Sequence, residues 1–144
     1  MYQDRASVMT RITALYVDKI ANTIFEDTGL SLAQYKILEY LYCNPDADVT
    51  TAALEAHFYM SHSTCVGLLN NLEKDGWIVR ERTAASGRTK VIRLTQKAED
   101  QRTAIQVCGQ RLEQAFTANL TGDEARQYIL LCNKILGTDA TEGE

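Results

Sequence analysis

The side chains best suited to contact another molecule lie on one face of a predicted helix, residues 61–75. Apolar residues at helical spacing should bury its other side: Cys65, Leu68, Leu69 and Leu72. The exposed side carries His62, Ser63, Val66, Gly67 and Asn70. Serine, histidine and asparagine can hydrogen-bond the edges of DNA bases, and valine can contact a thymine methyl group. Polar side chains on a helix often meet only water, so this face alone does not decide between the two interpretations.

Residues 60–95 are basic, although the chain as a whole is acidic. This segment carries a net charge of +3, whereas the remaining residues carry −7 and the whole chain −4. Two short segments with strand character, 77–82 and 90–94, flank a glycine-containing tip and predict a β-hairpin. Its cations, Arg82, Arg88 and Lys90, are suited to phosphate groups or a narrow minor groove. The helix and the hairpin together favour double-stranded DNA as the partner.

The histidines and cysteines do not form a pattern typical of a metal site or a disulfide framework. His57 and His62 lack acidic or cysteine companions at ligand spacing. The widely spaced cysteines are Cys43, Cys65, Cys108 and Cys132. The second and fourth fall on apolar helix stripes and are expected to be unreactive, while a redox switch stays an alternative. No glycine-rich phosphate loop or nucleophile-base pairing is recognisable, so an enzyme is the least favoured class, and no metal or cofactor is expected.

Helical periodicity dominates the chain and predicts a mainly α fold with a small β-hairpin. The expected helical segments are residues 5–27, the segment after Ser31 up to the break at Pro45, 52–59, 61–75, the segment after Thr95, and the segment after Thr121. The order of helix, short helix, helix and basic hairpin is typical of a winged helix-turn-helix lobe. A length of 144 residues fits a single domain.

Four motifs resemble those of the MarR (multiple antibiotic resistance regulator) family of winged helix-turn-helix transcription regulators. They are LSLAQYKIL at 30–38, MSHST at 60–64, LEKDGWIVR at 72–80 and RTKVIRLT at 88–95. The resemblance implies a repressor or activator that binds a pseudo-palindromic operator as a homodimer. It also implies a winged DNA-binding lobe over 30–95 and a helical dimerisation bundle from 5–28 and 96–137. The apolar stripes at both ends of the chain agree, because they need a partner to cover them.

The resemblance also assigns individual contacts. Matching contact positions at the start of the recognition helix are Ser61, Ser63 and Thr64, and the matching wing-tip arginine is Arg88. Three positions depart from the family pattern: Gly67 replaces a common arginine, Ser86 replaces an aspartate that often braces the wing arginine, and Asn71 replaces a frequently basic residue. A lost bidentate arginine contact removes about 1–3 kcal/mol of base discrimination. The alternative is therefore a winged-helix protein-interaction module with weakened or lost DNA binding.

The resemblance further implies a small aromatic effector, because many relatives bind aromatic acids in the cleft between bundle and lobe. Tyr16, Phe25, Tyr35 and Tyr40 could line such a cleft. Aromatic residues at helical spacing are more often ordinary core residues, and this interpretation stays open beside the first.

Nothing in the sequence indicates a membrane partner. No apolar run approaches the roughly 20 residues of a membrane span. The first residues, MYQDR, lack the basic-then-apolar order of a signal peptide. We therefore expect a cytoplasmic protein.

Overall fold

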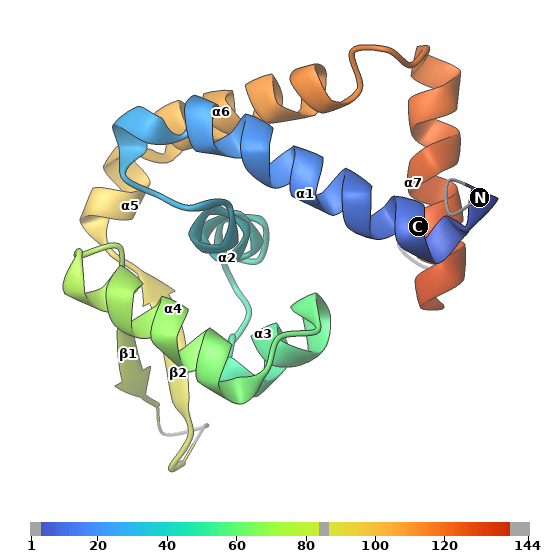
Figure 1. Cartoon of the computed structure of the whole chain (residues 1–144). Coiled ribbons are helices and arrows are strands. Elements are labelled where there is room, and N and C mark those ends of the chain that lie inside the picture. The colour runs from blue at the N-terminus through green and yellow to red at the C-terminus, as the bar shows by residue number, and fades with distance from the viewer. Residues whose placement is uncertain (1–3, 84–86, 139–144) are drawn as a thin grey trace.

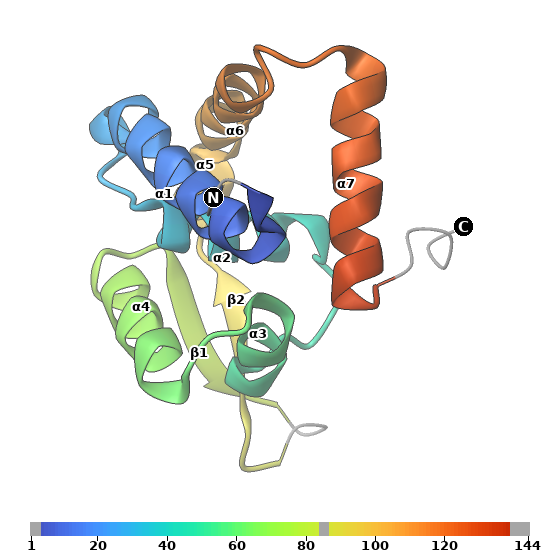
Figure 2. The ribbon, with the colours of Figure 1, turned by 45° about the vertical axis from the view of Figure 1, so that its right-hand side comes forward.

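The computed structural model describes residues 4–83 and 87–138, and a winged lobe lies below α1 and α6 in the view of Figure 1. The lobe consists of α2 (Leu32–Cys43), α3 (Thr51–Phe58), α4 (His62–Lys74), β1 (Ile78–Arg82) and β2 (Lys90–Leu94). The two strands pair antiparallel, from Ile78 opposite Leu94 to Arg82 opposite Lys90. Their hairpin extends from the lobe next to α3 and α4 (Figure 2).

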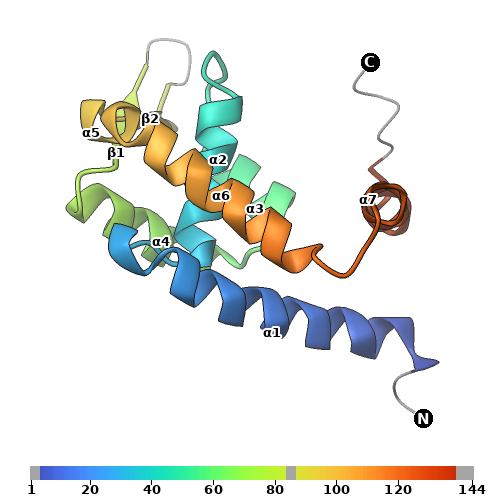
Figure 3. The same cartoon turned by 90° about the horizontal axis from the view of Figure 1, so that it is seen from above.

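The remaining helices come from the two ends of the chain and lie on the other side of α2. They are α1 (Ala6–Ile24), the 3-10 turn η2 (Glu26–Thr28), α5 (Gln96–Asp100), α6 (Arg102–Phe116) and α7 (Gly122–Leu136). α1 lies alongside α6, so two segments far apart in the sequence are neighbours in the fold (Figure 3).

Side-chain caps begin five of the helices. In α2, α3, α4, α5 and α7, the residue before the helix accepts a hydrogen bond from the backbone N–H three residues later. These caps are Ser31, Thr50, Ser61, Thr95 and Thr121. Gln34 and Glu124 complete capping boxes, because each side chain accepts from the backbone N–H of its cap residue. The helical segments predicted after Ser31, Thr95 and Thr121 therefore begin where the sequence pattern places them.

The core of the lobe forms where α2, α3, α4 and the sheet meet. Its fully buried side chains include Ile37, Leu38, Leu54, Leu69 and Leu72. Burial of each such side chain contributes roughly 1.5–3 kcal/mol. The Ile92 N–H donates to the Val49 carbonyl at 2.8 Å and joins β2 to the segment before α3. The Tyr42 hydroxyl donates to the Ala98 carbonyl at 2.6 Å and joins α2 to α5.

A second, smaller core joins α1, α2 and α6. Ala21, Phe25 and Leu112 are buried in it, and the Phe25 and Tyr35 ring centroids lie 4.6 Å apart. Gly109 of α6 permits this packing, because a Cβ atom there would lie 2.9 Å from Cζ of Tyr35 and overlap its hydroxyl group. The close approach of α2 and α6 therefore requires a residue without a side chain.

The first helix is shorter than the sequence pattern predicts. The pattern runs to residue 27, whereas α1 ends at Ile24 and a 3-10 turn follows, closed by Gly29 at a φ of 73°. The Thr28 hydroxyl donates to the Phe25 carbonyl at 2.6 Å and accepts from the Leu30 N–H at 3.1 Å. These local bonds replace helical ones and turn the chain towards α2.

The helical segment after Thr95 is divided at Gln101, where α5 ends and α6 begins. The division lets both parts pack inwards, since Ala98 of α5 and Ile105 of α6 are both buried. No glycine or proline marks this position in the sequence.

α7 stands apart from the lobe (Figure 2). None of its residues is buried. Its exposed large apolar side chains are Tyr128, Ile129, Leu130, Leu131, Ile135 and Leu136. In the part of the chain that the structure describes, no helix has the length and apolar character to cross a lipid bilayer.

Candidate nucleic-acid interface

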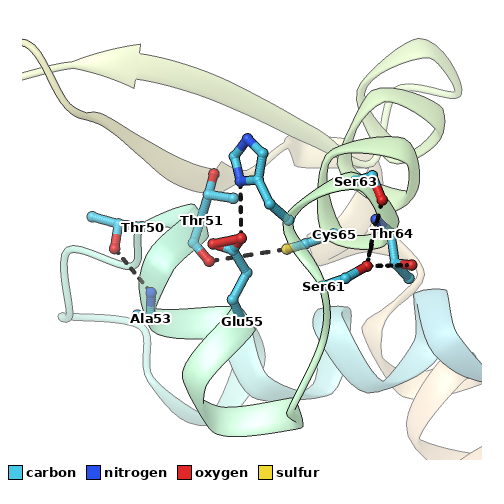
Figure 4. Close-up of polar contacts among 9 residues, drawn as sticks. Thr50, Thr51, Ala53, Glu55, Ser61, Ser63, Thr64 and Cys65 are labelled. Atoms are coloured by element: carbon cyan, nitrogen blue, oxygen red, sulfur yellow. Dashed lines mark hydrogen bonds and ion pairs between the residues drawn. The ribbon is translucent and has the colours of Figure 1, made fainter.

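The start of α4 presents three hydroxyl groups close together (Figure 4). The Ser61 hydroxyl accepts from the Thr64 N–H at 3.2 Å and donates to Thr64 Oγ1 at 2.9 Å. Ser63 Oγ lies 3.5 Å from Ser61 Oγ, and all three residues are exposed. Ser61 therefore holds the helix start, while Thr64 keeps a hydroxyl proton that can be donated outwards and the exposed Ser63 oxygen can accept from outside. The partial positive charge of the helix N-terminus adds attraction for a phosphate group.

His62 is positioned by the preceding helix. Its Nδ1 atom lies 2.8 Å from Oε1 of Glu55 in α3, and its side chain is 76% exposed. Because Nδ1 faces a carboxylate, it carries the proton in the neutral ring, which leaves Nε2 as an exposed acceptor. The contact spans the turn at Tyr59, which is the one non-glycine residue with a positive φ, 54°, in the described segments. The sequence pattern identified His62 as exposed but did not reveal Glu55 as its partner.

The two sides of α4 differ as the apolar spacing predicts. Cys65, Leu69 and Leu72 are buried, and Leu68 is partly buried. Gly67 and Asn70 are exposed on the opposite side. The space around Gly67 is open, since a Cβ atom there would meet nothing within 4 Å.

Arg80 of β1 binds the exposed side of α4. Its Nη2 atom donates to Asn70 Oδ1 at 2.7 Å and to Glu73 Oε1 at 2.8 Å. The hydrogen bond from Arg80 holds the pKa of Glu73 below its ordinary value. Because a guanidinium can only donate, the Asn70 amide must turn its oxygen towards Arg80 and its NH2 group outwards. The sequence places Arg80 in the basic segment, but no local pattern reveals that it orients Asn70.

The wing carries two cations directly opposite each other. Arg82 pairs in register with Lys90, and both are exposed. Like charges opposite each other on antiparallel strands repel, and an anion between them would relieve the repulsion. Arg88 is exposed on the turn that leads into β2. Ser86, which stands where the family often has an aspartate that braces the wing arginine, lies outside the described residues.

Arg93, the remaining cation of the wing, is engaged within the lobe. Its Nη2 atom pairs with Asp48 Oδ1 at 2.6 Å, and its Nε atom lies 3.6 Å from Glu81 Oε1. Arg93 therefore fastens β2 to the segment before α3.

The four aromatic residues predicted for an effector cleft do not all line one cavity. Tyr35 and Tyr40 line a cavity of about 560 Å³ between α2 and α3. Phe25 is 1% exposed and belongs to the core, where it contacts Tyr35. Tyr16 is exposed on α1. Burial raises the pKa of Tyr35 to about 12, so its hydroxyl stays protonated at neutral pH.

The four cysteines are free, and they differ in exposure. Cys65 is buried, Cys43 is exposed, and Cys108 and Cys132 are half-buried. Burial raises the pKa of the Cys65 thiol, as expected for a packing residue. Over residues 4–83 and 87–138, no three His, Cys, Asp or Glu side chains come together in a way that could hold a metal ion.

Comparisons with known proteins agree with the motif resemblance. Residues 28–89, from the turn before α2 into the wing, match the sequence model of the MarR family. No curated protein matches the chain in a direct sequence comparison.

Solved structures share the fold over almost the whole chain. A mutant of MarR from E. coli complexed with operator DNA is 23% identical, with a TM-score of 0.80, and the match covers 94% of this chain and 98% of that one. The MepR–DNA complex from S. aureus is 22% identical, with a TM-score of 0.80 and coverage of 96% and 99%. A MarR-family transcriptional regulator from a Rhodococcus species is 20% identical, with a TM-score of 0.83 and coverage of 94% and 96%. The mainly helical winged fold predicted from the sequence is therefore confirmed.

Proposed function

We propose that this chain, a member of the MarR family, acts in the cytoplasm as a homodimeric transcription regulator that binds a pseudo-palindromic DNA operator. One observation carries the proposal: the exposed polar side of α4 is joined through the Arg80–Asn70 hydrogen bond to a hairpin that places Arg82 opposite Lys90. A polar helix face suits the major groove, and a cationic strand pair suits the adjacent phosphates. Two proteins with the same fold, MarR of E. coli and MepR of S. aureus, are complexed with DNA in their structures.

In this proposal α4 supplies the base contacts. The groups that would reach base edges are the hydroxyls of Ser63 and Thr64, the Nε2 atom of His62 and the amide of Asn70. Ser61 acts through the helix start that it caps. Gly67 adds no side chain, so the helix backbone can approach the groove closely, but a contact is lost compared with a longer residue.

The wing would bind the DNA backbone. Arg88 on the exposed turn would enter the minor groove or contact its phosphates, and Arg82 and Lys90 would share a phosphate group. These contacts carry little sequence information, so the wing supplies affinity and α4 supplies specificity.

The bundle helices support the homodimer. α7 has no buried residue, yet it carries an apolar face that includes Ile129, Leu130 and Ile135. Ile12, Leu15 and Tyr16 are exposed on α1 as well. Apolar area of this extent on two helices is typical of an interface, and a second copy of the chain would cover both.

Gel-shift titration against DNA that flanks the gene tests this function. We expect saturable binding at low salt and a footprint of two half-sites about 34 Å apart. Arg88→Ala should weaken binding to all sequences and lower the salt slope by about 1, whereas Ser63→Ala should act at particular bases. The matched control is Arg111→Ala, since Arg111 is an exposed arginine of α6, away from α4 and the wing. It should change neither the overall affinity nor the base preference.

The absence of saturable binding at low salt would contradict the proposal. Stoichiometric recovery of a protein partner under the same conditions would then favour the protein-interaction module that the substitution at Gly67 suggests.

A further inference from the structure

We propose that Glu55 of α3 determines which base His62 recognises. With a neutral ring, His62 accepts a hydrogen bond from the exocyclic amine of cytosine, and with a protonated ring it donates to guanine instead. This inference rests on the function proposed above, because it requires the start of α4 to enter the major groove. It adds to that function a positioning residue outside α4, a pair of bases and a dependence of the base preference on pH.

The His62 ring is held at one nitrogen atom and exposed at the other. Its Nδ1 atom lies 2.8 Å from Oε1 of Glu55, whereas 76% of the His62 side chain is exposed. The Glu55 side chain, which extends from α3 (Figure 4), is only 21% exposed. The carboxylate is thus partly shielded from water and fixes the orientation of the ring. Nε2 is left as the nitrogen atom that can meet a base.

Glu55 also determines which nitrogen atom carries the proton. An ionised carboxylate can only accept hydrogen bonds, so Nδ1 donates to it both in the neutral ring and in the protonated ring. The second proton can then be gained or lost only at Nε2. The outward nitrogen atom is therefore an acceptor when the ring is neutral and a donor when the ring is protonated.

Cytosine and guanine distinguish these two forms of the ring. In the major groove, cytosine presents the N4 amine, which is a donor, whereas guanine presents N7 and O6, which are acceptors. The neutral ring therefore matches cytosine and the protonated ring matches guanine. Adenine distinguishes the forms less, because it presents a donor and an acceptor side by side.

The turn between α3 and α4 keeps the two side chains together, although seven positions separate them in the sequence. Tyr59 has a left-handed backbone with φ of 54°, and the Met60 N–H donates to the Glu55 carbonyl at 3.0 Å. Leu54 of α3 and Cys65 of α4 are fully buried in the same core. The ring is therefore oriented before DNA arrives, and binding does not have to order it.

The other ionisable groups around the start of α4 do not bond to the ring. On α3, His57 packs against an aromatic ring of α2. On α4, Cys65 is buried, and burial raises the pKa of its thiol, which is therefore neutral at pH 7. On the wing, Arg82 and Lys90 pair with each other across the strands. Over the described residues, the carboxylate on α3 is the one group that forms a hydrogen bond or ion pair with the His62 side chain.

Nitrogen-15 NMR of the histidine rings in the full chain, without DNA, tests the position of the proton. We expect the neutral His62 ring to carry its proton on Nδ1. Glu55→Ala should give a mixture of the two tautomers at His62 and leave the His57 ring unchanged. The variant His57→Gln assigns the two sets of signals. A neutral wild-type His62 ring that carries its proton on Nε2 would overturn the proposal.

Selection of binding sites from random DNA tests the base. It is carried out at about pH 5.5 and about pH 8, on either side of the ordinary histidine pKa of about 6.5. At one position of each half-site, we expect cytosine to be preferred at the higher pH and guanine at the lower pH. Each preference should be about two- to tenfold, the usual contribution of one hydrogen bond. His62→Ala should lose both preferences, and His57→Gln, the matched control, should keep them.

Glu55→Ala separates a positioning role from a structural one. The cytosine preference at about pH 8 should disappear, because the neutral ring can then donate from Nε2. The guanine preference at about pH 5.5 should remain, because the protonated ring donates from Nε2 in either case. A merely structural role would weaken binding at both pH values.

Equal losses in Glu55→Ala at both pH values, or a wild-type base preference that does not change with pH, would overturn the proposal. If the chain binds no DNA saturably, the proposed function fails and the base contact fails with it. The NMR result still decides whether Glu55 fixes the proton, so the two failures are distinguishable.

Discussion

Asn70 is exposed on α4, but one end of its amide is already occupied. Arg80 donates to Oδ1 at 2.7 Å, which leaves the NH2 group to face outwards. An asparagine that reads adenine uses both ends, since it accepts from N6 and donates to N7. Held by Arg80, Asn70 presents its NH2 donor outwards, and it therefore favours acceptors such as O6 and N7 of guanine.

The change Arg80→Met tests this specificity. It frees the Asn70 oxygen and should shift the preferred base at the contacted position from guanine towards adenine by about tenfold, in line with about 1–3 kcal/mol per bidentate contact. Selection of binding sites from random DNA measures the preference apart from overall affinity. The double variant Asn70→Ala, Arg80→Met should show no such shift, and an unchanged base preference in Arg80→Met would count against the orienting role.

Cys43 is exposed, yet its thiol is a weak acid. Burial of the sulfur raises its pKa, and the hydrogen bond and charge of Glu39 raise it further. Since the thiolate is the reactive form, Cys43 should react slowly at pH 8 and faster as the pH rises through its elevated pKa. Glu39→Gln should lower that pKa and speed the reaction at pH 8. Alkylation by iodoacetamide, followed at each cysteine by peptide mass spectrometry across pH 7–11, measures how the reaction rate of Cys43 depends on pH. Glu26→Gln is the control. An unshifted pH profile in Glu39→Gln would contradict the role of Glu39.

At the scale of elements, substitution of two helical glycines by alanine should change the stability of the fold in opposite directions. Gly109 lies against Tyr35 where α6 passes α2, whereas Gly67 on α4 has open space around it. Gly109→Ala should destabilise the fold by about 1–3 kcal/mol through overpacking. Gly67→Ala should stabilise it by roughly 0.5–1 kcal/mol, because alanine favours the helix. Urea unfolding measures the free energy of unfolding of both variants. Tyr35→Phe should partly relieve the effect of Gly109→Ala. Equal changes in the free energy of unfolding at the two glycines would contradict the packing argument.

Local chemistry explains which elements could be predicted from the sequence. Ser31 with Gln34 and Thr121 with Glu124 lie within one helical turn, so the local sequence is enough to place the starts of α2 and α7. The exposed side of α4 follows from apolar spacing in the same way. The division at Gln101 has no such signal, because it depends on how α5 packs against the lobe.

The contacts that tune the interface could not be predicted, because they join different elements. Arg80 meets Asn70 only because β1 returns past α4, and Glu55 meets His62 only because α3 and α4 cross at the turn. Similarly, the sequence pattern could not separate Tyr35 and Tyr40, which line the cavity, from Phe25, which lies in the core. The types of residue at the interface were predictable, but their partners were not.

At the scale of the whole molecule, positive charge is concentrated at one end. Residues 60–95 carry a net +3 and the rest of the chain −7. This separation orients the protein, because DNA attracts the winged end and repels the acidic remainder. An acidic protein can therefore approach DNA with its wings first, and its binding should weaken steeply with added salt.

The dimer is tested at the apolar face of α7. Ile135 is 79% exposed, and Ile135→Glu should convert the dimer to monomer, because a buried charge without a partner disrupts an apolar interface. DNA binding should fall at least tenfold, since one lobe reaches only one half-site. Sedimentation velocity measures the mass. Tyr59→Glu changes a similarly exposed side chain on the lobe (75% exposed) and should remain dimeric. A monomeric wild type or a dimeric Ile135→Glu variant would contradict the interface.

The placement of α1 and α7 at opposite ends of the chain has a consequence for synthesis on the ribosome. α1 is complete at residue 24 and α7 only at residue 136. At a translation rate of about 5–20 residues per second, roughly 5–20 s pass between the two. During this interval the exposed apolar side chains of α1 have no α7 from their own chain nearby. We therefore expect the apolar side chains of α1 in a nascent chain to be covered by a chaperone, or by a finished copy made from the same messenger RNA, until α7 has been synthesised.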